Sequence, residues 1–361
     1  MRRIGSRLGI AAVVALAALV AASGATAKSL TKVVYAGAPP QTQGIAEKLL
    51  PKNFPKLYQP DINAFFNKKT TINVGGTVSF RLQGFHTVDL AGKAGTPLPL
   101  IVPGKTLVSG VNDAAGSPFW FNGRVPNVGI NPALLGPPKT TTFNGKQRLD
   151  SGLPLGPPKP FNVKFTKAGT YRFFCDVHPG MIGTVVVKPA GKSIPTAKQD
   201  AKALVRQVTA DVKAAKKAAA AKLPPNTVSL GESTPGGVEL FTMFPATLTV
   251  NANTVVTFRM SKNSFETHTA TFGPAAELKK LAKGLEGVNF PAQGVFPSDP
   301  VQPIAESPTA HGDGFANTGA LDNDPHSAPI PSSGKIDFTA PGTYHFICLI
   351  HPFMHGTIIV K

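Results

Sequence analysis

The chain contains the same short string twice, built from residue types that bind a soft, redox-active metal. Residues 175–181 read CDVHPGM and residues 348–354 read CLIHPFM. In each string a Cys is followed three positions later by a His and six positions later by a Met. A thiolate, an imidazole and a thioether on one tight loop need only a second His to complete a trigonal His₂Cys set with a weak axial Met, a geometry suited to copper.

A candidate second His lies far upstream of each string, just after a strand-like run. Phe80-Arg81-Leu82 precedes the first, and Phe258-Arg259-Met260 precedes the second. We therefore predict two metal sites, one in each half of the chain. Their ligands would be His86, Cys175, His178 and Met181 in the first half, and His268, Cys348, His351 and Met354 in the second.

Strand-like runs must position these loops. One run precedes each Cys and another follows each Met, at residues 169–174, 183–188, 342–347 and 356–361. Tyr171, Phe173 and Cys175 occupy every second position, so they share one face of a strand. That face is predicted to point toward the core and the metal.

Taken together, these motifs resemble the cupredoxins, the plastocyanin–amicyanin–azurin family of blue copper proteins. The Cys-x-x-His-x-x-Met loop, with Pro after the His, is similar to the short ligand loop of amicyanin. The resemblance implies a type 1 copper site in each half and electron entry through the ring edges of His178 and His351 near the surface. Many plastocyanin-like proteins carry Asn after the first His to brace the Cys, whereas this chain has Thr87 and Thr269.

An internal duplication with a period near 175 residues extends this pattern over the chain. Residues 66–82 (FNKKTTINVGGTVSFRL) align with residues 244–260 (FPATLTVNANTVVTFRM), and both alternate polar and apolar positions around a turn. We predict an all-β fold of two cupredoxin-type Greek-key β-sandwiches joined by an α-helical linker. The predicted boundaries are an export signal at 1–27, domain 1 at 28–189, the linker at 190–225 and domain 2 at 226–361.

Each predicted domain carries a long segment rich in Pro and Gly between its first His and its Cys, at residues 90–160 and 272–333. These segments are expected to form loops and short strands over one end of their own sandwich. The second contains His311 and His326 among several Asp residues, which favours a solvated polar loop over a further metal site.

The linker is predicted to be a helix over residues 196–223. Leu204, Val208 and Val212 recur every four positions, and Pro224-Pro225 ends the pattern. Because the apolar stripe is otherwise mostly Ala, we favour a spacer or a brace packed on one sandwich over a basic helix that contacts an anionic surface.

The N-terminus is predicted to direct export. Arg2, Arg3 and Arg7 precede an apolar run over residues 8–22, and Ala25-Thr26-Ala27 is a small-residue cleavage site. The mature chain would begin at Lys28, carry no transmembrane segment, and be periplasmic, bound to the cell surface or extracellular. An uncleaved N-terminal anchor is the alternative.

Charge is distributed unevenly over a chain whose formal net charge is +18. Residues 28–188 hold 19 basic and 6 acidic side chains, whereas residues 226–361 hold 7 and 11. Such asymmetry could steer two different partners, a redox donor and a redox acceptor, or serve solubility alone. No aromatic-and-basic motif for nucleic acid is present in the sequence.

Two alternatives concern the cysteines and the chemistry. A disulfide between the two cysteines of an exported chain is disfavoured, because each Cys belongs to its own complete ligand string. Copper oxidases and reductases of related fold need His-x-His pairs or a His beside the Cys, and the sequence has neither. We therefore predict an electron carrier with two coppers per chain rather than an enzyme. Copper storage or delivery is the alternative, and a copper oxidoreductase with an additional site in the second insertion is the less favoured one.

Overall fold

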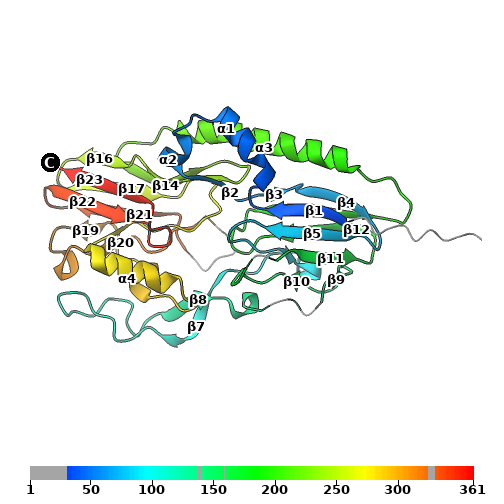
Figure 1. Ribbon diagram of the computed structural model, residues 1–361. Coiled ribbons are helices and arrows are strands. Elements are labelled where there is room, and N and C mark those ends of the chain that lie inside the picture. Colours follow the sequence, from blue (N-terminus) through cyan, green and yellow to red (C-terminus); the bar gives the residue numbers. More distant parts are fainter. Residues whose placement is uncertain (1–30, 137, 139, 158, 324–329) are drawn as a thin grey trace, which may run out of the picture.

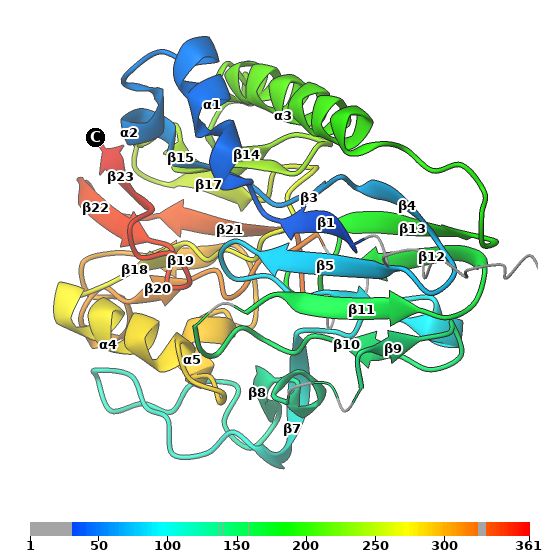
Figure 2. The same cartoon turned by 45° about the vertical axis from the view of Figure 1, so that its right-hand side comes forward.

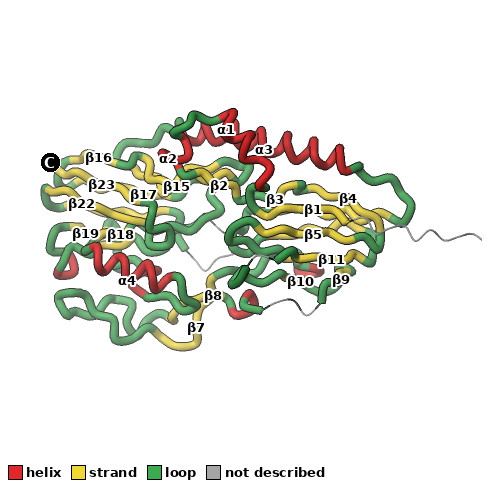
Figure 3. The backbone as a smooth tube through the Cα atoms, in the orientation of Figure 1, coloured by secondary structure: helices red, strands yellow, loops and turns green. Residues whose placement is uncertain are grey.

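The computed structural model describes residues 31–136, 138, 140–157, 159–323 and 330–361. The predicted export signal and cleavage site lie outside the described residues, as do Asp324 and His326. Two stacks of strands lie side by side, with helices along their edges (Figure 1; Figure 3).

The first stack is a β-sandwich of two five-stranded sheets. In one sheet the strand order is β3 (Phe65–Phe66), β1 (Thr31–Ala36), β5 (Thr77–Leu82), β11 (Phe161–Phe165) and β9 (Thr142–Phe143). In the other it is β10 (Leu149–Asp150), β6 (Asp89–Leu90), β12 (Gly169–Phe174), β13 (Ile182–Lys188) and β4 (Lys69–Asn73).

Alternation along the strands explains why the two sheets pack face to face. In β11, Phe161, Val163 and Phe165 are buried while the residues between them are exposed, as expected for a strand with one wet face. Phe80 from one sheet meets Phe173 from the other edge to face, with ring centroids 5.1 Å apart. The inner faces therefore form a single aromatic-rich core.

The second stack repeats this architecture. One sheet runs β19 (Ile304–Glu306), β21 (Ser333–Phe338), β17 (Thr254–Arg259), β14 (Thr227–Ser233), β15 (Val238–Phe244) and β2 (Pro60–Ile62). The other runs β16 (Thr247–Val250), β23 (His355–Val360), β22 (Gly342–Ile347), β18 (Thr271–Phe272) and β20 (Ala316–Asn317). Phe258 and Phe346 meet at 5.3 Å and occupy the places of Phe80 and Phe173. The predicted all-β class and β-sandwich architecture are confirmed.

Two segments from the first half of the sequence cross to the second sandwich. Strand β2 pairs antiparallel with β15 at the edge of the six-stranded sheet. The hairpin of β7 (Ile101–Leu107) and β8 (Pro126–Ile130) carries a long tip whose Phe119 and Phe121 pack against α4 (Ala275–Leu285). The first insertion is expected to cover its own sandwich. Contrary to this expectation, its aromatic tip is buried against the second sandwich.

The helix between the sandwiches, α3 (Ala197–Ala219), braces both of them. Thr196 and Gln199 form a capping box at its start. Its apolar stripe is buried as predicted: Leu204, Val208 and Val212 pack near Phe66 of the first sandwich, and the C-terminal alanines pack near Leu240 of the second. Figure 2 shows α3 running along one side of both stacks.

The other helical segments are short, and they are α1 (Gln43–Leu49), α2 (Phe54–Tyr58), α5 (Ala292–Val295) and the 3-10 turns Pro40–Thr42, Gly92–Ala94, Pro132–Leu134 and Ala310–Gly312. Within the described ranges, no helix combines the length and apolarity needed to cross a bilayer.

Glu306, in β19, is expected to make stability depend on pH. Burial, and then the charges of Asp313 and Asp299, raise its pKa to about 8, and its Oε2 has no hydrogen-bond partner. Between the pKa of Glu306 in the unfolded chain and pH 8, only the folded state holds this proton. The free energy of unfolding should therefore fall by about 2 kcal/mol from pH 5 to pH 7. Chemical denaturation of Glu306→Gln should lack this part of the decline. An identical pH profile in the variant would contradict the prediction.

Candidate metal centres

Each predicted ligand loop is the connection of an antiparallel hairpin. The first loop joins β12 to β13, and the second joins β22 to β23. In the first, the Cys175 amide donates to the Met181 carbonyl at 3.1 Å, and the Met181 amide donates to the His178 carbonyl at 2.8 Å. The second loop has the same two hydrogen bonds, at 3.0 and 2.8 Å. The spacing of three residues thus folds each loop into a closed turn.

In the first sandwich, the loop meets the upstream His in the core. His86 and His178 point their Nδ1 atoms at each other, 3.0 Å apart. The Cys175 sulfur lies 3.5 Å from Nδ1 of His178 and 3.9 Å from Nδ1 of His86. All three side chains are buried, and Met181 is buried beside them in the same core.

The second sandwich reproduces this cluster. The Nδ1 atoms of His268 and His351 are 3.1 Å apart. The Cys348 sulfur lies 3.5 Å from Nδ1 of His268 and 3.8 Å from Nδ1 of His351. Met354 is buried with Cys348 in the core of this sandwich. The structure therefore brings the two histidines and the cysteine of each predicted set into matching clusters, and it buries the Met of each loop in the same core as the cysteine.

The electrostatics of both clusters favour thiolates. Burial alone would raise the pKa of Cys175, but the charge and hydrogen bond of His178 and the hydrogen bond and charge of His86 lower it to about 5. The pKa of Cys348 is also lowered, because hydrogen bonds and charge from His268 and His351 outweigh burial. Two nitrogens and a thiolate that converge in a dry core form the donor set that a copper ion requires, so the residues fit such an ion.

Both cysteines are free thiols, each buried in its own sandwich. This arrangement contradicts the alternative of a disulfide between them.

Thr87 and Thr269 brace the cysteines in both halves. The Thr87 amide donates to the Cys175 sulfur at 3.4 Å, and its hydroxyl accepts from the Asp176 amide at 2.7 Å. The Thr269 amide donates to the Cys348 sulfur at 3.5 Å, and its hydroxyl accepts from the Leu349 amide at 2.8 Å. A threonine can therefore fix the Cys strand where the resemblance leads one to expect Asn.

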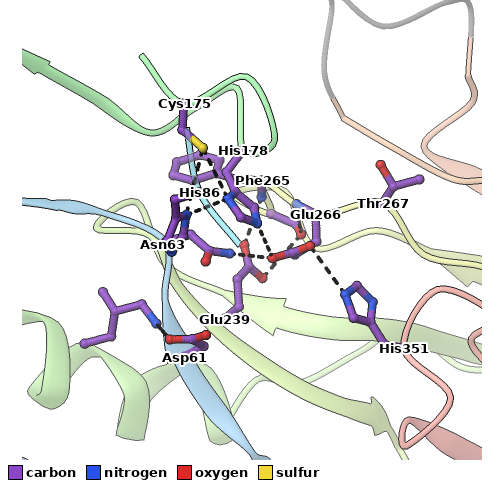
Figure 4. A network of polar contacts seen from close by, with 12 residues as sticks. Asp61, Asn63, His86, Cys175, His178, Glu239, Phe265, Glu266, Thr267 and His351 are labelled. Carbon is purple, nitrogen blue, oxygen red and sulfur yellow. Dashed lines mark hydrogen bonds and ion pairs between the residues drawn. The ribbon is translucent and has the colours of Figure 1, made fainter. Parts of the chain in front are cut away.

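His178 is buried, contrary to the expectation from the resemblance that both loop histidines lie near the surface, whereas His351 is partly exposed. His178 is 6% exposed, and its outer Nε2 lies 3.0 Å from the carboxylate of Glu266 in the second half. Nε2 of His351 lies 3.7 Å from the same carboxylate. Figure 4 shows Glu266 between the two rings, with Asn63 donating to it at 2.5 Å. The two centres thus face each other across the contact between the sandwiches.

Sequence reasoning missed Glu266 as a functional candidate. Its position two residues before His268 is a local signal, but nothing in the sequence indicated that a His from the other half would reach it. Burial alone would raise the pKa of Glu266, but the charge and hydrogen bond of His178 and the charges of His351 and His268 hold it well below its usual value.

The residues around His311 form a polar contact between the halves. Its ring nitrogens lie 3.3 Å from Asp113 and 3.2 Å from Asp299. Asp322 instead accepts a hydrogen bond from Thr267. Within the described part of the chain, the one other group of side chains that could hold a metal is Asp89, Asp150 and Asp176, whose Asp89 pairs with Arg148.

Comparison with known protein families finds a match for one segment of the chain. Residues 141–188 match the family of copper binding proteins described as the plastocyanin/azurin family. This segment runs from β9 to β13 and contains Cys175, His178 and Met181. No curated protein is significantly similar to the chain.

Several solved structures are similar to one half of the chain. They include plastocyanin from the fern Dryopteris crassirhizoma (22% identity, 37% of this chain, 99% of that chain, TM-score 0.21), a purple cupredoxin from Nitrosopumilus maritimus (14%, 37%, 98%, 0.20) and auracyanin A, a blue copper protein from Chloroflexus aurantiacus (22%, 37%, 96%, 0.24). All of these TM-scores are below 0.5. Residues 141–188 are therefore similar to the plastocyanin/azurin family of copper binding proteins, within a chain whose two halves both fold as β-sandwiches.

Proposed function

We propose that this protein is an exported type 1 (blue) copper protein that transfers electrons by an outer-sphere mechanism, with one mononuclear copper site in each half. The observation that carries the proposal is the convergence of two imidazole Nδ1 atoms and a thiolate in each buried cluster. The proposed ligands are those predicted from the sequence, with Met181 and Met354 as weak axial donors.

Bound copper would supply a one-electron couple at each site. The side chains of the chain would hold its geometry, because each Cys and loop His is fixed by a closed turn between two paired strands. Cys175 and Cys348 are fully buried in the aromatic cores, whereas the loop histidines line a cavity between the halves. A site whose ligands are held by paired strands and do not rearrange suits electron transfer better than substrate chemistry.

Two redox proteins, a donor and an acceptor, are the proposed partners, and we propose a carrier rather than an enzyme. We also propose that the protein is exported to the periplasm, the cell surface or the exterior, and that the domain boundaries lie at residues 189 and 226. The basic first half and the linker are further proposed to contact an anionic surface. The alternative function is copper storage or delivery. The burial of both cysteines disfavours delivery, because a delivery site must hand its metal to a partner.

Replacing either cysteine tests the proposal. Cys175→Ser and Cys348→Ser should each remove one of two coppers per chain and about half of the visible thiolate-to-copper absorption, because each thiolate serves one site. The measurement is a copper count with a visible spectrum on the wild type, both variants and the double variant.

Other outcomes would contradict the proposal in distinct ways. Bound copper without the thiolate band would favour storage, and a band that survives both substitutions would exclude these cysteines as ligands. A third copper that is lost in His311→Ala would revive the oxidoreductase alternative.

A further inference from the structure

We propose that Glu266 is a bridge that couples the two copper sites, so that an electron passes within the chain from one loop histidine to the other. This inference builds on the proposed function and adds the internal route, which a pair of independent sites would lack. In this arrangement the loop histidines act as the link between sites rather than as two surface ports.

The orientation of the rings is the first argument. In both clusters the Nδ1 atoms face the thiolate, which leaves Nε2 of His178 and His351 pointing outward. Both outward atoms point at one carboxylate: Oε1 of Glu266 lies 3.0 Å from His178, and Oε2 lies 3.7 Å from His351. The first distance is a charge-assisted hydrogen bond, and the second is a longer polar contact, so the link to the second ring is the weaker one.

The second argument is that the bridge is held rigidly and from both halves. Asn63, which follows β2, donates to Oε1 of Glu266 at 2.5 Å. The backbone before Glu266 is fixed by Glu239, which accepts from the Phe265 amide at 2.9 Å and from the Ser264 hydroxyl at 3.3 Å. Because contacts from both halves fix the carboxylate, it keeps its two contacts and does not need to reorient when the electron is transferred.

The third argument is that the first ligand loop packs against the second half at this point. The Phe265 ring lies so close to Gly180 of the first loop that a Cβ there would come within 2.0 Å of it. Phe241 of the second half lies against His351, with ring centroids 5.0 Å apart. His178, Glu266 and His351 also line one cavity of about 690 Å³ between the halves, so the route follows the polar contacts at the wall of this cavity.

The proposed step balances without any further reactant. With copper bound at both sites, one electron would leave the reduced site, which would become oxidised, and would enter the oxidised site, which would become reduced. The two imidazoles and the carboxylate provide the connection, no covalent bond forms or breaks, and both Nε2 protons stay on their rings.

Glu266→Gln tests the bridge, with Glu306→Gln as the matched control. Both residues are buried glutamates of the second half, but Glu306 lies in β19, at the opposite edge of the six-stranded sheet from β2. All proteins would carry Met354→Gln, because changing the weak axial ligand gives the second site its own spectrum and potential. Pulse reduction of the copper-loaded protein would then follow the electron from one absorption band to the other.

We expect the rate of electron exchange between the sites to fall several-fold in Glu266→Gln and to stay unchanged in Glu306→Gln. Loss of the carboxylate charge should also favour the reduced state of the first site by about tenfold, a potential rise of ~59 mV for a one-electron couple, with a smaller rise at the second site. Two intact bands with unchanged rate and potentials would overturn the bridge. Absence of the bands in the wild type would instead overturn the proposed function.

A measurement on the reduced, copper-loaded wild type covers the case in which Glu266→Gln does not fold. The Nε2 protons of both His178 and His351 should exchange slowly with solvent in nuclear magnetic resonance, because both point at a buried carboxylate. Fast exchange at either ring would overturn the bridge.

Discussion

Gly37→Ala is expected to abolish copper binding at the first site and to destabilise the first sandwich. Gly37 directly follows β1 and has a φ of +86°, a conformation that favours glycine. A Cβ there would lie 2.3 Å from the Gln83 carbonyl oxygen and 2.8 Å from Nε2 of His86. The His86 ring must therefore move, and backbone strain with overpacking should cost about 2–6 kcal/mol.

Gly75→Ala is the matched control for Gly37→Ala. Gly75 has a similar φ of +83°, but a Cβ there would meet nothing within 4 Å. This variant should lose only the stability that the unfavourable backbone conformation costs, and it should keep both coppers. A copper count and chemical denaturation of the two variants separate the effects. If Gly37→Ala bound two coppers with an unchanged spectrum, the close fit against His86 would be refuted.

Phe121→Ala is expected to cost about 3–5 kcal/mol and to release the β7–β8 arm from the second sandwich. Phe121 is fully buried, stacks on Phe119 at 5.1 Å and contacts Phe296 of the second half at 5.5 Å. Its removal leaves a cavity at the centre of the apolar cluster that joins the arm to α4.

The single tryptophan of the chain reports this change directly. Trp120 donates from its indole nitrogen to the Pro297 carbonyl at 2.8 Å, so its environment changes when the arm leaves. We expect red-shifted fluorescence in Phe121→Ala at low denaturant. Leu107→Ala, in the same arm but 53% exposed, should leave fluorescence and stability unchanged. Equal effects of the two substitutions would show that the arm is not held by this cluster.

The sequence alone was sufficient to predict the two clusters and the strands that hold them. A Cys, His and Met at spacings of three fold into one closed turn, and alternation places Phe173 and Cys175 on the same inward face. These features depend on residues that are close together in the chain. Because the duplication repeats them, the pattern in each half supports the prediction made for the other half. The stripe of α3 was predictable for the same reason.

Tertiary structure alone decided how the halves meet. No local pattern predicts that Pro60–Ile62 lies on the edge of the second sandwich, Phe121 on α4, or Glu266 on His178. Each of these contacts joins residues that are far apart in the chain and ordinary in their local pattern. Their pairing depends on the shapes of two folded surfaces and on the burial gained when they dock, which no periodicity records. The strings of ligands could thus predict two metal centres, but only the docked structure placed one carboxylate between them.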